Sequence, residues 1–132
     1  MYFPDLSQYS YLEHSPFSLK EKPRPLNVGW LDIKHTFPTD KASKDLLDAL
    51  FEACSHPVNK MRGFHQCLFC RSHVWAVEVS RGDRTIILGS AEIRVKGKDG
   101  KVYAAPDLIF HYVAEHHYKP PTEFVEALLS QS

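Results

Sequence analysis

The residues best suited to chemistry lie close together in the middle of the chain. Cys67 and Cys70 form a Cys-x2-Cys pair, with His65 before it and His73 after it. This spacing lets the backbone turn so that both sulfurs face one point, and tetrahedral zinc needs that convergence together with two further nitrogen or sulfur ligands. The stretch therefore predicts a structural metal site or, without a metal, a pair of reduced and half-buried thiols.

The other ligands of such a site must be histidines from nearby or from a distant element. His65 is the local candidate, and His111 or His116 could come from a helix predicted near the C-terminus. At about 100° per residue, His116 lies within the apolar stripe of that helix, where a core histidine bonded to a backbone carbonyl is the alternative. His111 lies off the stripe and diverges from His116 by about 140°, which disfavours joint binding of one ion. We therefore expect a zinc-like site with the ligands Cys67, Cys70, His65 and His116.

Other chemistries fit the cysteine pair less well. A disulfide oxidoreductase places its Cys-x2-Cys at a helix N-terminus, whereas a predicted strand follows this pair. Haem attachment requires a histidine directly after the second cysteine, and Arg71 occupies that position. The third cysteine, Cys54, continues the apolar face of a predicted helix and is expected to be a small core residue.

Catalytic motifs are missing from the sequence. It contains no nucleophile elbow, no Gly-rich phosphate loop and no His-Glu-x2-His zinc motif. Glu115 with His116 and His117 could act as a general base, although histidines near a helix C-terminus also simply interact favourably with the helix dipole. We therefore predict a non-enzymatic binding protein. The alternative is a zinc-dependent enzyme of unknown substrate, with three protein ligands and an open water position.

The composition is that of an ordinary globular protein without a charge bias. The chain has 132 residues, and its 16 basic and 16 acidic residues cancel, which disfavours binding to nucleic acids or to anionic membranes. Three cysteines cannot form a complete disulfide set, and the first residues lack the basic and apolar regions of a signal peptide. The apolar runs are also shorter than a membrane span. We expect a cytoplasmic protein.

An α+β fold is predicted for a single domain at residues 27–132, after an irregular aromatic arm at residues 1–26. A short strand is expected at residues 27–33. A helix is expected from residues 38–40 to Cys54, with Thr39 or Asp40 as its cap. The apolar face of this helix has the members Leu46, Leu47, Leu50, Phe51 and Cys54.

The second half of the chain predicts strands and then helices. Residues 74–80, 85–88, 91–95 and 102–105 are rich in β-formers and are separated by turn signals, which indicates an antiparallel β-meander of three to five strands. A helix should open at Pro106-Asp107, and a second one should follow Pro120-Pro121. The first of these helices carries His116, and we expect the cysteine loop to pack against it.

Several motifs resemble an uncharacterised family of small bacterial proteins. They are Leu26-Asn-Val-Gly-Trp-Leu-Asp32, Arg62-Gly-Phe-His-x-Cys-x-Phe-Cys70, Gly89-x-Ala-Glu-Ile-Arg-Val95, Tyr103-Ala-Ala-Pro-Asp-Leu-Ile109 with His111-Tyr112, and Pro120-Pro121-x-Glu-Phe124. The resemblance covers most of the chain from about residue 26 and implies a stand-alone bacterial protein. By analogy with many small bacterial proteins, it suggests an immunity protein whose partner is a toxin.

Overall fold

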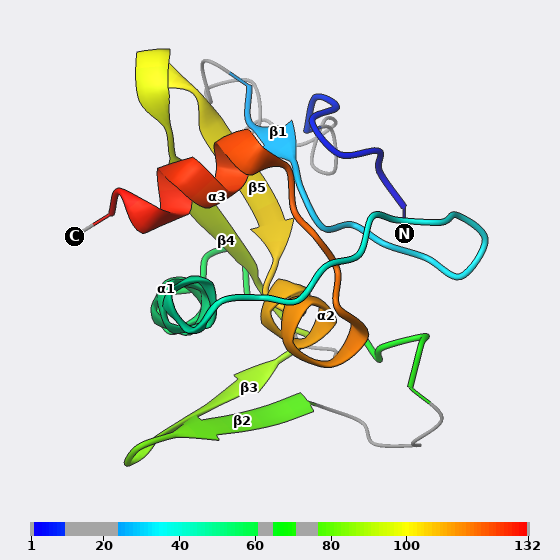
Figure 1. Cartoon of the computed structure of the whole chain (residues 1–132), viewed down its shortest axis with the longest axis vertical. Helices are drawn as coiled ribbons and strands as arrows, with labels where there is room; N and C mark the ends of the chain where they lie inside the picture. The colour runs from blue at the N-terminus through cyan, green and yellow to red at the C-terminus, as the bar shows by residue number, and fades with distance from the viewer. Residues whose placement is uncertain (1, 10–23, 61–64, 71–76, 132) are drawn as a thin grey trace.

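The computed structural model describes residues 2–9, 24–60, 65–70 and 77–131. These residues form three α-helices and five β-strands, an α+β fold as the sequence predicts (Figure 1). The elements in chain order are β1 Leu26–Asn27, α1 Lys44–Cys54, β2 Val77–Arg81, β3 Arg84–Leu88, β4 Glu92–Lys96, β5 Val102–Pro106, α2 Ile109–His116 and α3 Thr122–Leu129.

The strands are divided between two sheets, whereas the sequence suggested one meander. β4 pairs antiparallel with β5, and the short β1 pairs parallel with β5 on its other edge. β2 and β3 form a separate hairpin. The chain leaves β3 at Gly89, whose amide donates to the Asp107 carboxylate at 2.7 Å, so the pairing of β3 does not continue into β4.

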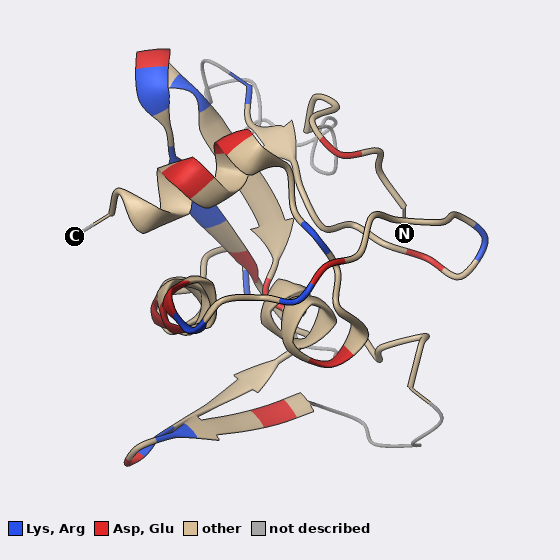
Figure 2. Cartoon of the chain, in the orientation of Figure 1, with Lys and Arg blue, Asp and Glu red and all other residues tan. Residues whose placement is uncertain are grey.

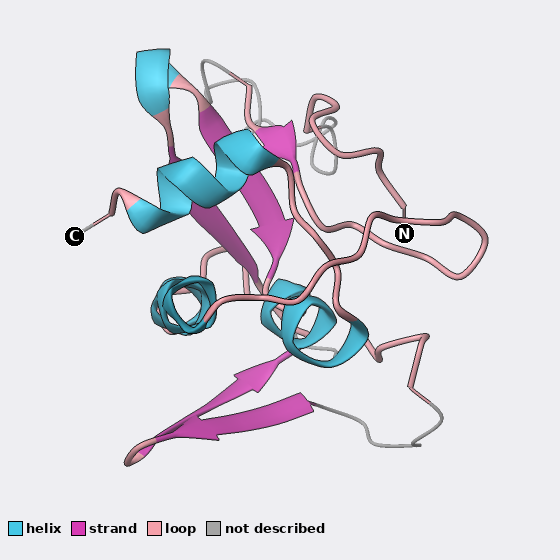
Figure 3. Cartoon of the chain, viewed as in Figure 1, coloured by secondary structure: helices cyan, strands magenta, loops and turns pink. Residues whose placement is uncertain are grey.

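Helices α1 and α2 lie between the hairpin and the three-stranded sheet, and α3 lies across the face of that sheet (Figures 1 and 3). α1 packs against α2, α3 and β4, so its apolar face contributes to the core shared by these elements. The largest fully buried side chains come from all of these layers and include Leu50, Ile93, Ile109, Val113 and Phe124.

Helix α1 begins later than the sequence predicts. Ser43 is its cap, and the Ser43 hydroxyl accepts a hydrogen bond from the Leu46 amide at 3.1 Å. The predicted cap at Thr39 or Asp40 is wrong, because residues 38–40 run as an extended segment beside residues 117–119. The amide of Asp40 donates to the carbonyl of His117 at 2.9 Å. This pairing ties the chain before α1 to the end of α2.

The described part of the N-terminal arm adds to the sheet. Residues 6–9 run antiparallel to residues 25–27, with the Leu6 amide donating to the Asn27 carbonyl at 2.6 Å and the Tyr9 amide donating to the Pro25 carbonyl at 2.8 Å. The strand expected at residues 27–33 is limited to Leu26–Asn27. Residues 10–23 of the predicted arm and residues 74–76 of a predicted strand lie outside the described residues.

The arm also explains the burial of Glu92, a charged residue on β4. The Glu92 side chain is buried, and the Tyr9 hydroxyl lies 3.0 and 3.1 Å from its two carboxylate oxygens. Arg94 donates to the same carboxylate at 2.8 Å, and its guanidinium lies over the Tyr9 ring. A buried carboxylate is tolerated when it is paired and hydrogen-bonded in this way.

The β2–β3 hairpin contacts α1 through its two arginines. Arg81 forms an ion pair with Asp48, and Arg84 forms one with Glu52 at 2.8 Å. Figure 2 shows that α1 carries acidic residues and that the neighbouring hairpin carries basic ones. Solvent screens both exposed pairs, so they orient the hairpin more than they stabilise the fold. In the described part of the chain, every helix is too short or too polar to cross a bilayer.

Candidate metal centre

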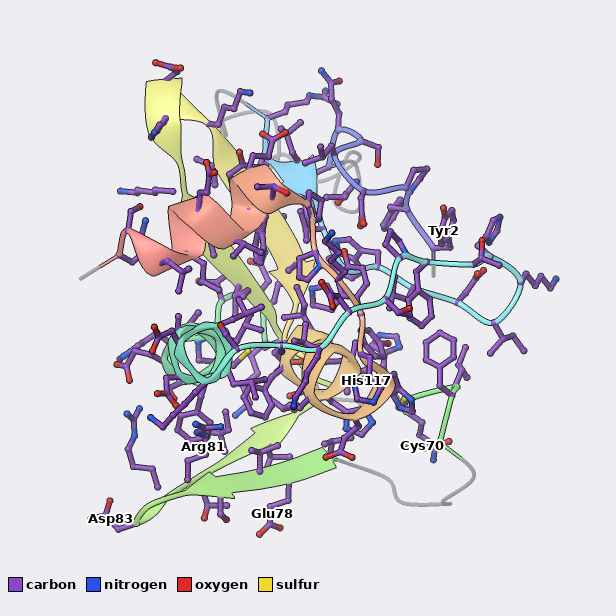
Figure 4. All side chains as sticks on the ribbon, in the orientation of Figure 1. Tyr2, Cys70, Glu78, Arg81, Asp83 and His117 are labelled. Atoms are coloured by element: carbon purple, nitrogen blue, oxygen red, sulfur yellow. The ribbon has the colours of Figure 1, made fainter. Side chains whose placement is uncertain are left out.

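Four side chains from two separate parts of the chain converge on one point. Cys67 and Cys70 lie on residues 65–70, which we call the cysteine loop, and His111 and His116 lie on α2. Their four ligand atoms, two Sγ and two imidazole nitrogens, all lie within 4.8 Å of one another. Figure 4 shows the Cys70 side chain beside the end of α2 that carries His117.

The spacing of these atoms is that of a tetrahedral metal site. With Zn–S bonds of about 2.3 Å and Zn–N bonds of about 2.0–2.1 Å, each sulfur lies about 3.5 Å from each nitrogen. The Nε2 atom of His116 lies 3.2 Å from Cys67 Sγ and 3.4 Å from Cys70 Sγ. The Nε2 atom of His111 lies 3.1 Å from Cys70 Sγ. These three sulfur–nitrogen distances are therefore close to those of an occupied site, and all the ligand atoms lie within 4.8 Å of one another.

Hydrogen bonds alone account poorly for this cluster. The Nε2 atom of His116 faces two sulfurs, and the sulfur of Cys70 faces two imidazole nitrogens. A thiol has one proton and a neutral imidazole nitrogen accepts or donates once, so these shared contacts cannot all be good hydrogen bonds. One cation at the centre would satisfy all four atoms together.

The end of α2 places His116 where it can reach the sulfurs. His116 is the last residue of the helix, and His117 follows in the left-handed conformation at φ 57° with its amide bonded to the Tyr112 carbonyl. Tyr118 is fully buried, and its neighbour Lys119 pairs with the segment before α1. The turn after His116 is therefore held on both sides.

The cysteine loop is held against the fold by its backbone and by Phe69. The His65 amide donates to the Gly89 carbonyl at 2.6 Å. Phe69 stands between the two cysteines in the sequence. Its ring packs against the rings of Tyr112 and His116, with centroid distances of 5.8 and 5.4 Å, respectively. These contacts fix the loop on one side of α2.

Burial shifts the pKa of both imidazoles and of the Cys67 thiol. It lowers the pKa of His111, with repulsion from His116 as a further cause, and it also lowers the pKa of His116. Both imidazoles are therefore neutral at pH 7, which is the form that binds a metal. Burial raises the pKa of the Cys67 thiol, and a bound cation would reverse that effect by favouring the thiolate.

The structure brings together three of the four residues expected from the sequence and adds His111. Cys67, Cys70 and His116 belong to the group, whereas the His65 side chain is exposed and lies outside it. Helical geometry alone disfavours His111 as a ligand, because it diverges from His116 by about 140° around the helix axis. Imidazole rings extend several ångströms from the backbone, and the His111 and His116 rings lean together, with centroids 5.0 Å apart.

The signal for His111 was present in the sequence as a second histidine on the same helix. The other candidates lie elsewhere. Glu115 and His117 are exposed and do not belong to the group, and His73 lies outside the described residues. Cys54 is a core residue as predicted, and burial raises the pKa of its thiol far above the usual value.

Comparison with known proteins adds a family without an assigned activity. Neither the search of curated proteins nor the search of solved structures found a match to this chain. The family model of DUF7919, described as a domain of unknown function, matches residues 1–129. This match spans both sheets, the three helices and all four residues of the candidate metal centre. The chain therefore belongs to the DUF7919 family of domains of unknown function.

Proposed function

We propose that this protein binds one Zn²⁺ through Cys67, Cys70, His111 and His116, and that the ion has a structural role in a non-enzymatic protein. The observation that carries the proposal is the convergence of four protein ligand atoms within 4.8 Å. Structural zinc is held by four protein ligands, whereas catalytic zinc keeps a position open for water or substrate. A complete set of side chains therefore favours the structural role.

The type and number of ligands favour a single zinc ion. Two thiolates with two imidazoles are a usual tetrahedral zinc set, and harder cations such as Mg²⁺ and Ca²⁺ prefer oxygen ligands. Two thiolates also balance the charge of Zn²⁺, so the occupied centre is neutral. That matters because Cys67 and His111 are buried, and an uncompensated charge there would be costly.

The ion would tie together segments that are far apart in the chain. The cysteine loop precedes the β2–β3 hairpin, and the two histidines follow β5 on α2. A metal that closes such a long loop stabilises the folded state by restricting the unfolded chain. Zinc binding to the folded state alone adds about 4 kcal/mol when free zinc is about a thousandfold above the dissociation constant.

Zinc content and ligand variants test this proposal. Protein purified without an affinity tag should contain one zinc per chain by elemental analysis. The variants Cys67→Ser, Cys70→Ser and His111→Ala should each bind zinc at least tenfold more weakly in a chelator competition. His65→Ala is the matched control and should bind as the wild type does. Cobalt substitution should give the absorption of a four-coordinate S₂N₂ site.

Two results would contradict the proposal. One is a protein that contains no zinc and binds none when zinc is added. The other is a loss of zinc binding in His65→Ala with none in His111→Ala, because the ligand set would then differ from the one proposed here. A cobalt spectrum that shifts when exogenous ligands are added would instead favour an open, catalytic position.

The biological role in this proposal is binding to another protein in a reducing compartment such as the cytoplasm, where thiolates remain available to zinc. The most specific form, suggested by analogy alone, is an immunity protein that neutralises a bacterial toxin. Pull-down of the untagged protein from its native cell tests this role. Recovery of one stoichiometric protein partner would support it, and a strictly solitary protein would contradict it.

A further inference from the structure

The two cysteines of the candidate centre differ in their access to solvent. Cys67 is buried, whereas Cys70 is partly exposed, and both are reduced and unpaired. We propose that the centre is also a redox switch, in which a peroxide oxidises Cys67 and Cys70 to a disulfide and releases the zinc. This inference rests on the proposed function, because it concerns the regulation of the same site.

The geometry allows the two sulfurs to bond to each other. They belong to a group whose ligand atoms lie within 4.8 Å, and only two residues separate them in the chain. A disulfide requires an S–S distance of about 2.05 Å, so closing the bond needs a local movement of the cysteine loop. Oxidation of Cys70 removes one thiolate ligand of the ion, so the ion no longer holds the two sulfurs apart and the loop can make this movement.

Exposure decides which sulfur reacts first. The nucleophile in such oxidations is the thiolate, and both cysteines are thiolates when they bind zinc. Cys70 is the more accessible of the two and is therefore the site of attack on the peroxide. Cys54 is buried in the core, and burial raises the pKa of its thiol, so it should stay reduced under the same conditions.

The reaction balances with one hydrogen peroxide. The Cys70 thiolate attacks one peroxide oxygen, the O–O bond breaks, and the leaving hydroxide takes a proton to become water. The Cys67 thiolate then attacks the Cys70 sulfenic acid, forming the S–S bond and breaking the S–O bond, and the second hydroxide also becomes water. Two thiolates lose two electrons, the peroxide gains two, two protons are consumed and Zn²⁺ is released.

Zinc release would remove the metal link between the cysteine loop and α2 and leave only weaker contacts between them. The loop would keep its backbone bond from His65 to Gly89 and the ring contacts of Phe69. It would lose the link to His111 and His116, whose neutral imidazoles alone bind zinc weakly without the thiolates. The oxidised form therefore holds the cysteine loop less firmly against α2 than the zinc-bound form does.

The test uses the zinc-loaded full-length chain and hydrogen peroxide. Zinc content is measured first, so that a chain without zinc refutes the proposed function and not the switch. Stoichiometric peroxide should then release one zinc per chain to a chromogenic chelator. Mass spectrometry of peptides should find a Cys67–Cys70 disulfide with Cys54 reduced, and a dithiol reductant should restore zinc binding.

A variant outside the centre keeps the test specific. Cys54→Ala should release zinc at the wild-type rate, because Cys54 takes no part in the reaction. The switch is refuted if zinc stays bound while Cys70 is oxidised, or if zinc leaves without a Cys67–Cys70 disulfide. It is also refuted if the disulfide includes Cys54.

Discussion

Replacing Gly89 with alanine should destabilise the protein and weaken zinc binding, because Gly89 lies directly against the cysteine loop. Its φ of +110° is a conformation that L side chains rarely adopt. A Cβ atom at this position would lie 2.7 Å from the carbonyl oxygen of His65, two residues before Cys67. A backbone atom cannot give way as the end of a flexible side chain does, so the loop itself must move.

The magnitude follows from these two costs and from a matched control. A side chain in a left-handed conformation costs about 1–2 kcal/mol, and displacing the packed loop adds to that cost. We expect Gly89→Ala to lower the free energy of unfolding by about 2–4 kcal/mol. Gly82 has a φ of +63° and no atom within 4 Å of its added Cβ, so Gly82→Ala should cost only about 1 kcal/mol.

Urea unfolding at a fixed zinc concentration measures the free energies, and competition with a chelator measures zinc affinity. Gly89→Ala should bind zinc at least tenfold more weakly, because moving the loop displaces Cys67 and Cys70 from the two histidines. Gly82→Ala should bind zinc as the wild type does. Equal losses of stability in the two variants, with unchanged zinc affinity in Gly89→Ala, would refute the packing argument.

Two further predictions concern the core. Burial raises the pKa of Asp107 to about 6 from an ordinary 3.8, so the folded state binds this proton more tightly than the unfolded chain does. The free energy of unfolding should therefore gain about 2 kcal/mol from this group as the pH falls from 7 to 4, and Asp107→Asn should lose that gain; parallel pH profiles of the two proteins would contradict it. Phe124 is 0% exposed and Leu129 on the same helix is 47% exposed, so Phe124→Ala should cost about 3–5 kcal/mol in thermal or urea unfolding and Leu129→Ala less than about 1. Similar losses for the two variants would show that α3 does not pack as described.

Local patterns were enough to predict most of the elements. The apolar face of α1 lies in the core, as its helical spacing predicts, and its buried residues are Leu46, Leu50, Phe51 and Cys54. Ile93 and Val95 on β4 are buried, as their alternation predicts. Such patterns are readable because they depend on residues within a few positions of each other.

Long-range contacts explain the differences. Helix α1 starts at Lys44, later than predicted, because residues 38–40 pair with the chain after α2, about eighty residues away in sequence. Glu92 is buried because Tyr9, in the N-terminal arm, covers it. Neither contact leaves a trace in the local pattern of apolar residues.

The candidate centre divides in the same way. The Cys67–Cys70 pair can be recognised from the amino-acid sequence, since two cysteines at this spacing can present both sulfurs to one point whatever surrounds them. The histidines that face this pair are set by contacts between distant parts of the chain. His65 is close to the pair in sequence, but its backbone is bonded to Gly89 and its side chain is exposed to solvent. The packing of α2 beside the cysteine loop instead brings His111 and His116 to the sulfurs. Ligand choice depends on how distant elements pack, and spacing along the chain does not contain that information.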